Sequence, residues 1–132
     1  MAFSSIEGLL SAAAERPLWE AVLEDDRADR GVERAASWDK MSRLWAAMKE
    51  PVDGYDPARR SHSGLTGGEG SLLEGPGPGL CPPFLRAVLA AALKTGECNA
   101  CMGRIVAAPT AGASGVLPAV LLPLQRRDER ED

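Results

Sequence analysis

The sequence lacks the features of several protein classes. Its 15 Lys and Arg residues are outnumbered by 19 Asp and Glu, and a net charge of −4 argues against a nucleic-acid-binding surface, which needs a basic patch. No basic and then apolar stretch precedes a small-residue cleavage site, so no secretory signal is visible. Three cysteines, an odd number, fit a reducing compartment better than a disulfide framework. We therefore expect a cytoplasmic protein that binds no nucleic acid.

Internal repeats and the alternation of apolar and polar residues that marks half-buried strands are also missing. A hydrophobic share of 45% is enough for a core, although 14 glycines and 10 prolines are many for compact regular structure. Residues 105–124 form an uncharged run long enough to span a membrane, but Pro109, Pro118 and Pro123 would leave backbone groups unpaired in lipid. We predict an all-α chain of at most one domain with no membrane span.

Helical signals dominate the first part of the chain. Ser4 and Glu7 have the spacing of a capping box, which predicts a helix over residues 5–15. Pro17 suits the first turn of a second helix, and Gly31 is the expected break after it.

A third helix has the clearest apolar pattern, with spacings of three and four residues. Its two tryptophans could form a ligand platform, but the periodicity favours a place in the core. Pro51 and Gly54 are expected to end this helix. The apolar residues are Trp38, Met41, Leu44, Trp45 and Met48.

The second half of the chain predicts two more helices. Pro83 can open a helix that continues to about Arg104, and residues 116–122 are an apolar helix start. Residues 125–132 are almost all charged and should form a solvated, frayed end. The apolar face of the first of these helices consists of Leu85, Val88, Leu89, Ala92 and Leu93.

Two segments combine glycine with hydroxyl-bearing residues. We name residues 61–68 the SGLTGG loop and residues 109–115 the PTAG loop. The first has the composition of an anion-binding turn, and the second leads into a helix start whose N–H groups favour anions. Composition also allows a flexible loop and a simple turn between core helices. The SGLTGG loop lacks the endings of a nucleotide P-loop and the spacing of a dinucleotide fingerprint.

Residues 102–118, Met-Gly-Arg-Ile-Val-Ala-Ala-Pro-Thr-Ala-Gly-Ala-Ser-Gly-Val-Leu-Pro, resemble the signature of the iron–sulfur-dependent L-serine dehydratases, in their alpha subunit or catalytic domain. The SGLTGG loop and residues 94–101 resemble that family as well. Family alpha subunits are longer, so the chain resembles the N-terminal half of one, an incomplete part of a larger helical domain. Its expected parts are N-terminal helices over residues 1–50, a loop region over 51–82, helices around the signature over 83–124 and a charged tail over 125–132.

The resemblance implies L-serine ammonia-lyase chemistry. Water is eliminated from L-serine to give pyruvate and ammonia, and an iron of a [4Fe-4S] cluster polarises the leaving hydroxide. The general base stays unassigned, and His62, a lone loop histidine, could equally be solvated. We expect the two loops to face one another and form one side of a pocket for the substrate carboxylate. The implied substrate-binding residues are Ser61, Ser63, Thr66, Gly67, Thr110 and Gly112.

The three cysteines do not by themselves predict a metal site. Cys98 and Cys101 form one C-x-x-C pair, which lacks a second pair or a downstream histidine, and Cys81 is the third thiol. Structural cysteines are the first interpretation, with metal and redox roles as alternatives. In the family, many members carry a cluster cysteine where this sequence has Ser114, and the later ligands would follow residue 132. We therefore expect an incomplete ligand set.

The expected partners are L-serine and a C-terminal half or beta subunit of serine dehydratase. Two alternatives remain, namely a non-catalytic remnant and a helical subunit that completes an enzyme by pairing with another chain. Residues 116–122 would leave an apolar helix face uncovered, so the chain alone is expected to fold poorly.

Overall fold

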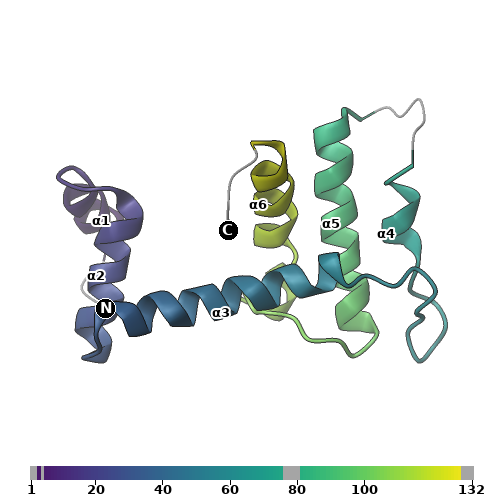
Figure 1. The fold of residues 1–132 in the computed structure, drawn as a ribbon, viewed down its shortest axis with the longest axis horizontal. Coiled ribbons are helices and arrows are strands. Elements are labelled where there is room, and N and C mark those ends of the chain that lie inside the picture. The colour runs from purple at the N-terminus through teal and green to yellow at the C-terminus, as the bar shows by residue number, and fades with distance from the viewer. Residues whose placement is uncertain (1–2, 4, 76–80, 129–132) are drawn as a thin grey trace. The chain divides into compact units, whose positions relative to one another are not determined.

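The computed structural model describes residues 3, 5–75 and 81–128, in two compact units, Met1–Leu44 and Trp45–Asp132. Within these residues it contains six α-helices, one 3₁₀ helix and no strand (Figure 1). The predicted all-α class is confirmed. Over the same residues, none of the helices combines the length and hydropathy that a membrane span requires.

The first unit begins with α1 (Ile6–Ala13) and α2 (Leu18–Arg30). Ser5 caps α1, because its Oγ accepts a hydrogen bond from the Gly8 amide at 3.1 Å; the expected cap, Ser4, lies outside the described residues. Gly31 ends α2 with a left-handed backbone at φ 61°, as predicted.

Two apolar residues of α3 (Arg34–Asp53) are exposed, although the sequence predicted that they lie in the core. Trp38 and Met41 were expected in a core, but they are 57% and 61% exposed. Trp38 packs edge-on against Trp19, with ring centroids 6.0 Å apart, whereas Trp45 packs on the core of the second unit. Apolar periodicity identifies one face of a helix, but it does not say that other elements cover the whole face.

Helix ends also differ from expectation. Pro51 lies inside α3, which continues for two residues to Asp53, and only Gly54 follows its end; the proline removes one backbone donor from the last turn without ending the helix at that residue. The next long helix, α5 (Pro83–Ala100), opens at Pro83 as predicted but stops before Arg104.

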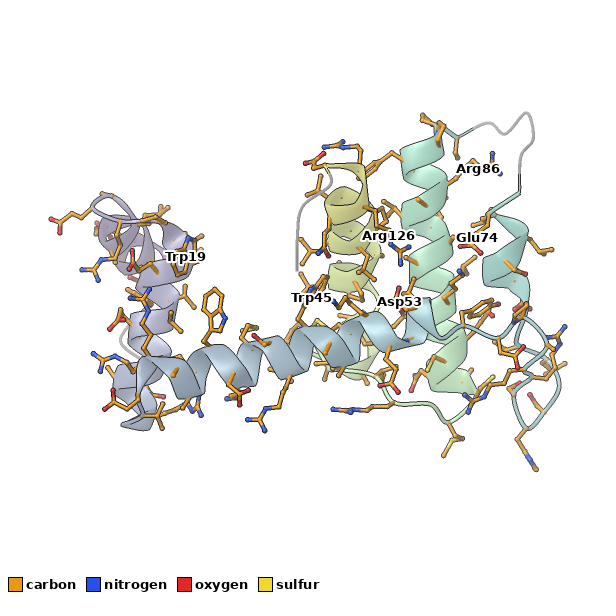
Figure 2. All side chains as sticks on the ribbon, viewed as in Figure 1. Trp19, Trp45, Asp53, Glu74, Arg86 and Arg126 are labelled. Carbon is orange, nitrogen blue, oxygen red and sulfur yellow. The ribbon has the colours of Figure 1, made fainter. Side chains whose placement is uncertain are left out.

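The last helix, α6 (Val116–Arg127), includes residues that the sequence assigned to a frayed tail. Arg126 Nη2 lies 2.5 Å from Asp53 Oδ1 at the end of α3, and the two side chains point toward one another (Figure 2). The Arg127 guanidinium lies 5.1 Å from the centroid of the Phe84 ring. These contacts hold the final turn in place up to Arg127.

The core of the second unit lies where α3, α5 and α6 meet. Val52, Ala91, Ala119 and Leu122 are its buried members. Alanines on α5 and α6 leave little side-chain volume between the helices, so their backbones approach closely. On the other side of α5 lies the short helix α4 (Glu69–Leu72), so that α5 stands between α4 and α6 (Figure 1).

The C-terminus of α5 has the hydrogen bonds of a Schellman motif. The Gly103 amide donates to Cys98 O at 2.7 Å, and the Met102 amide donates to Asn99 O at 3.0 Å. Met102 occupies the left-handed position at φ 61°, where glycine is usual, and it is 90% exposed.

Met102→Gly should therefore raise the free energy of unfolding by about 0.5–1 kcal/mol, since a left-handed backbone costs a residue with a Cβ roughly that much. Ala87→Gly is the matched control, because it places glycine at an exposed position inside α5 and should cost about 1 kcal/mol. Urea unfolding measures both changes. A Met102→Gly protein no more stable than the parent would contradict the strained conformation.

Candidate functional site

A buried carboxylate lies between α5 and the SGLTGG loop. Glu97, on α5, is 5% exposed. Its Oε2 accepts hydrogen bonds from the Tyr55 hydroxyl at 2.5 Å and the Gly68 amide at 2.9 Å, and its Oε1 accepts one from the Gly70 amide at 2.8 Å. Three donors compensate the charge for its loss of water. Burial, together with the hydrogen bond to Glu97, raises the pKa of Tyr55 to about 12.

A second buried charge lies one helical turn before Glu97. Lys94 Nζ is 2.6 Å from Glu74 Oε1, beside α4, and 4.9 Å from the centroid of the Tyr55 ring (Figure 2 labels Glu74). Residues three apart share one face of a helix. The alanine-rich α5 thus presents charged side chains toward α4 and small apolar side chains toward α6.

Glycines allow this close approach. Gly67 and Gly68 have φ of 138° and 90°, and a Cβ on Gly67 would lie 2.2 Å from Arg59 O. A Cβ on Gly70 would lie 2.7 Å from Lys94 Cγ. Without these glycines, the amides of residues 68 and 70 could not reach Glu97 in the same geometry.

The SGLTGG loop uses its backbone donors within the chain. The Gly64 amide donates to Ser61 O, the Leu65 amide to Ser63 Oγ and the Thr66 amide to Ser61 Oγ, and the Gly67 amide donates to the Glu69 carboxylate. A hydrogen bond from the Glu69 backbone amide, and then the one from Gly67, lower the pKa of the Glu69 carboxyl. The Gly68 amide donates to the chain's own Glu97 carboxylate, and the substrate anion expected at this loop stays a prediction.

The hydroxyl groups of this loop differ in how they are engaged. Ser61 Oγ and Ser63 Oγ are 3.2 Å apart and share a hydrogen bond. Thr66 Oγ1 and the His62 imidazole form no hydrogen bond within the described residues. The loop thus holds two paired hydroxyls and one that can still bind another group.

The PTAG loop lies beside a different part of α5. Thr110 Oγ1 accepts from the Ala113 amide at 3.3 Å and so caps the 3₁₀ helix Ala111–Ala113. Gly112 and the buried Ser114 line a cavity of about 280 Å³. Gly96 and Asn99 of α5 form the opposite wall of this cavity.

The two loops do not share a pocket in the described part of the chain. The SGLTGG loop contacts Glu97, whereas the PTAG loop lies against Gly96 and Asn99, on another face of the same helix. The two loops were expected to face one another, but in the described residues they do not, because α5 lies between them. The substrate-binding role of the six predicted residues stays a prediction.

The thiols are divided between the two ends of α5. Cys98 and Cys101 line a cavity of about 210 Å³ together with Arg59 and Arg104. Cys98 Sγ lies 3.6 Å from Arg104 O, to which it donates, and burial raises the pKa of the Cys98 thiol. Cys81 precedes the other end of the helix, about 27 Å away along 18 residues. Among residues 3, 5–75 and 81–128, no three Cys, His, Asp or Glu side chains gather as metal ligands.

Sequence reasoning missed the residues that organise this site. Glu97, Tyr55 and Lys94 are contributed by two segments that lie about 40 residues apart in sequence, so no local pattern joins them. The available signal was two opposite charges, Lys94 and Glu97, three residues apart on a helix rich in alanine and leucine. Charges in such a helix need partners, which points to a polar neighbour on that face.

Comparison with known proteins finds relatives of the chain by sequence. The family model described as serine dehydratase alpha chain matches residues 13–131. The probable L-serine dehydratase alpha chain of Bacillus subtilis (strain 168) is 34% identical over 90 residues, which are 66% of this chain and 29% of that protein. The L-serine dehydratase alpha chain of Peptoniphilus asaccharolyticus is 52% identical over 46 residues, which are 35% and 16%. The chain thus matches less than a third of either relative. No solved structure matches it.

Gly67→Ala should lower the free energy of unfolding by about 2–4 kcal/mol, because the new Cβ collides with Arg59 O and the backbone must move. Gly64→Ala is the control in the same loop: its φ is also positive at 73°, but its Cβ would meet open space, so about 1 kcal/mol is expected. Chemical denaturation compares the two variants. Equal losses would mean that residue 67 does not lie against residue 59.

Proposed function

Because the chain belongs to the serine dehydratase alpha chain family, we propose that it forms a substrate-binding part of an iron–sulfur-dependent L-serine ammonia-lyase. The proposed reaction eliminates water from L-serine and gives pyruvate and ammonia. The relatives are named L-serine dehydratase alpha chains, which supports this substrate class. The observation that carries the proposal is the SGLTGG loop, a closed turn that bears hydroxyl groups and is hydrogen-bonded to Glu97 of α5.

The hydroxyls of this loop, more than its backbone, are the proposed substrate contacts. The amides of residues 64–68 already have acceptors in the chain. Thr66 Oγ1 is free to donate to a substrate carboxylate or hydroxyl, and Ser61 and Ser63 can exchange their mutual bond for one to substrate. Gly112 lines the other cavity, and Thr110 lies two residues before it in the same loop, so both would contribute from the side of α5 that carries Gly96 and Asn99.

The thiols of the described residues do not fit a [4Fe-4S] cluster. Such a cluster needs several thiolates within a few ångströms of one another. Cys98 and Cys101 supply two, Cys81 lies beyond the far end of α5, and Ser114 offers a hydroxyl in place of a thiol. A cluster in a complete enzyme would have to take ligands from other residues.

A partner is part of the proposal. Leu85, Leu89 and Leu93 are spaced four residues apart and form an exposed apolar stripe on α5, and α6 exposes Val116 and Val120 at the same spacing. Apolar stripes of this kind support docking of further protein, such as the C-terminal half or the beta subunit of a serine dehydratase. The same stripes favour the second candidate, a helical subunit that completes an enzyme formed with another chain.

Thr66→Ala should lower kcat/KM for L-serine about 10²-fold in a complete enzyme that contains this chain, as expected when one donor is removed. Thr66→Ser keeps the hydroxyl and is the matched control. Stability should change little, because Thr66 Oγ1 has no described partner. Steady-state kinetics decides the point, and full activity of Thr66→Ala would contradict the assignment.

Thr110→Ala tests the second loop in the same assay and should also lower kcat/KM. Since Thr110 Oγ1 caps a 3₁₀ helix, the Ala variant also loses about 1 kcal/mol of stability. Thr110→Ser retains the cap and separates the two effects. If Thr110→Ala loses stability but keeps its activity, the role of Thr110 is structural only.

A further inference from the structure

We propose that Glu97 is a positioning residue, whose carboxylate fixes the SGLTGG loop in the one conformation that presents its hydroxyls to substrate. The inference rests on the proposed function, because it takes that loop to be the substrate loop. It assigns a task to a side chain on a different element, 31 residues beyond Thr66 in the sequence.

A buried carboxylate is energetically unfavourable as a packing group for a helix. Burying a charge costs several kcal/mol before its partners compensate, and apolar residues of similar volume often pack as well or better. Two of its three donors are backbone amides of the loop region, Gly68 and Gly70, and the third is the Tyr55 hydroxyl. A group with these contacts selects one loop conformation, which an apolar side chain could not do because it offers no acceptor.

The loop needs such an anchor. Gly64, Gly67 and Gly68 all have positive φ, and glycine has many backbone conformations of similar energy. The hydrogen bond from Gly68 to Glu97 fixes the end of the loop against α5, a helix of 18 residues. A small shift at that end would move Thr66, two residues away.

The effect extends from the anchor to all three hydroxyls. The Thr66 amide donates to Ser61 Oγ at 3.2 Å, and Ser61 Oγ is 3.2 Å from Ser63 Oγ. The Ser61 amide closes the turn by donating to Thr66 O at 2.8 Å. A displaced residue 66 would therefore carry residues 61 and 63 with it.

The first test uses the chain itself and needs no activity. Tyr55 is the only tyrosine, so tyrosinate absorbance reports its titration alone. Burial, the larger cause of the raised Tyr55 pKa, persists in Glu97→Gln, but the variant removes the charge that opposes ionisation, so the Tyr55 pKa should fall below about 12 while it stays above 10. Glu50→Gln, an exposed carboxylate on α3, should leave it unchanged. Circular dichroism confirms that the helices persist over the titration. An unmoved Tyr55 titration in Glu97→Gln would overturn the contact and the proposal.

The second test ranks two variants in a complete enzyme. Glu97→Gln keeps the shape but loses the charge, whereas Glu97→Asp keeps the charge and shortens the side chain. If Glu97 positions the loop through its carboxylate, Glu97→Gln should lower kcat/KM for L-serine about 10²-fold, which is the typical effect of a displacement near 1 Å. Glu97→Asp should lower kcat/KM less than Glu97→Gln does. A Gln variant as active as the parent, or more active than Asp, would overturn the positioning role and leave only packing.

A third variant covers the case in which Glu97→Gln fails to fold. Tyr55→Phe removes one of the three donors and keeps the charge and the ring, so a loss of about tenfold in kcat/KM is expected, and an unchanged value would contradict the proposal. These tests also distinguish failure of the proposed function from failure of the Glu97 contact. If the loop does not bind substrate, Thr66→Ala has no effect on activity, whereas the Tyr55 titration still responds to Glu97→Gln.

Discussion

The second unit depends on how one buried charge is accommodated. The Glu97 carboxylate is removed from water and is stable only because Tyr55, Gly68 and Gly70 donate to it. The donors come from the residues after α3, from the SGLTGG loop and from α4. Because the carboxylate needs all three hydrogen-bond donors, it helps to fix where the end of α3, the SGLTGG loop and α4 meet α5.

The second constraint is that α5 packs against other elements on two of its faces. Its alanines allow α6 to approach and form the small core with Val52 and Leu122. Its charged residues, Lys94 and Glu97, hold α4 and the SGLTGG loop on the other side. The two glycine-rich loops are thus separated by a helix, and any site that uses both must extend around α5 or include residues outside the described part of the chain.

The sequence predicted the local features and missed those that need distant partners. Gly31 and Pro83 mark helix boundaries through backbone chemistry, and both predictions are confirmed. The family was predicted from the motif in residues 102–118 and is confirmed by the family model. Trp38 and Met41 were placed in a core wrongly, because periodicity does not report whether a face is covered. The composition of the SGLTGG loop predicted either an anion-binding turn or a flexible loop, and a substrate anion there stays a prediction. The hydrogen bond from its Gly68 amide to Glu97, about 30 residues away, leaves no local pattern.

Native-state amide hydrogen exchange tests the central claim most directly. If the Glu97 carboxylate holds the loop, the Gly68 and Gly70 amides should exchange slowly and by the same opening event, since both donate to one group. The His62 amide, which has no described acceptor, is the reference within the same loop and should exchange much faster. Exchange of Gly68 and Gly70 at the rate of His62 would show that the carboxylate does not hold the loop and would contradict the account.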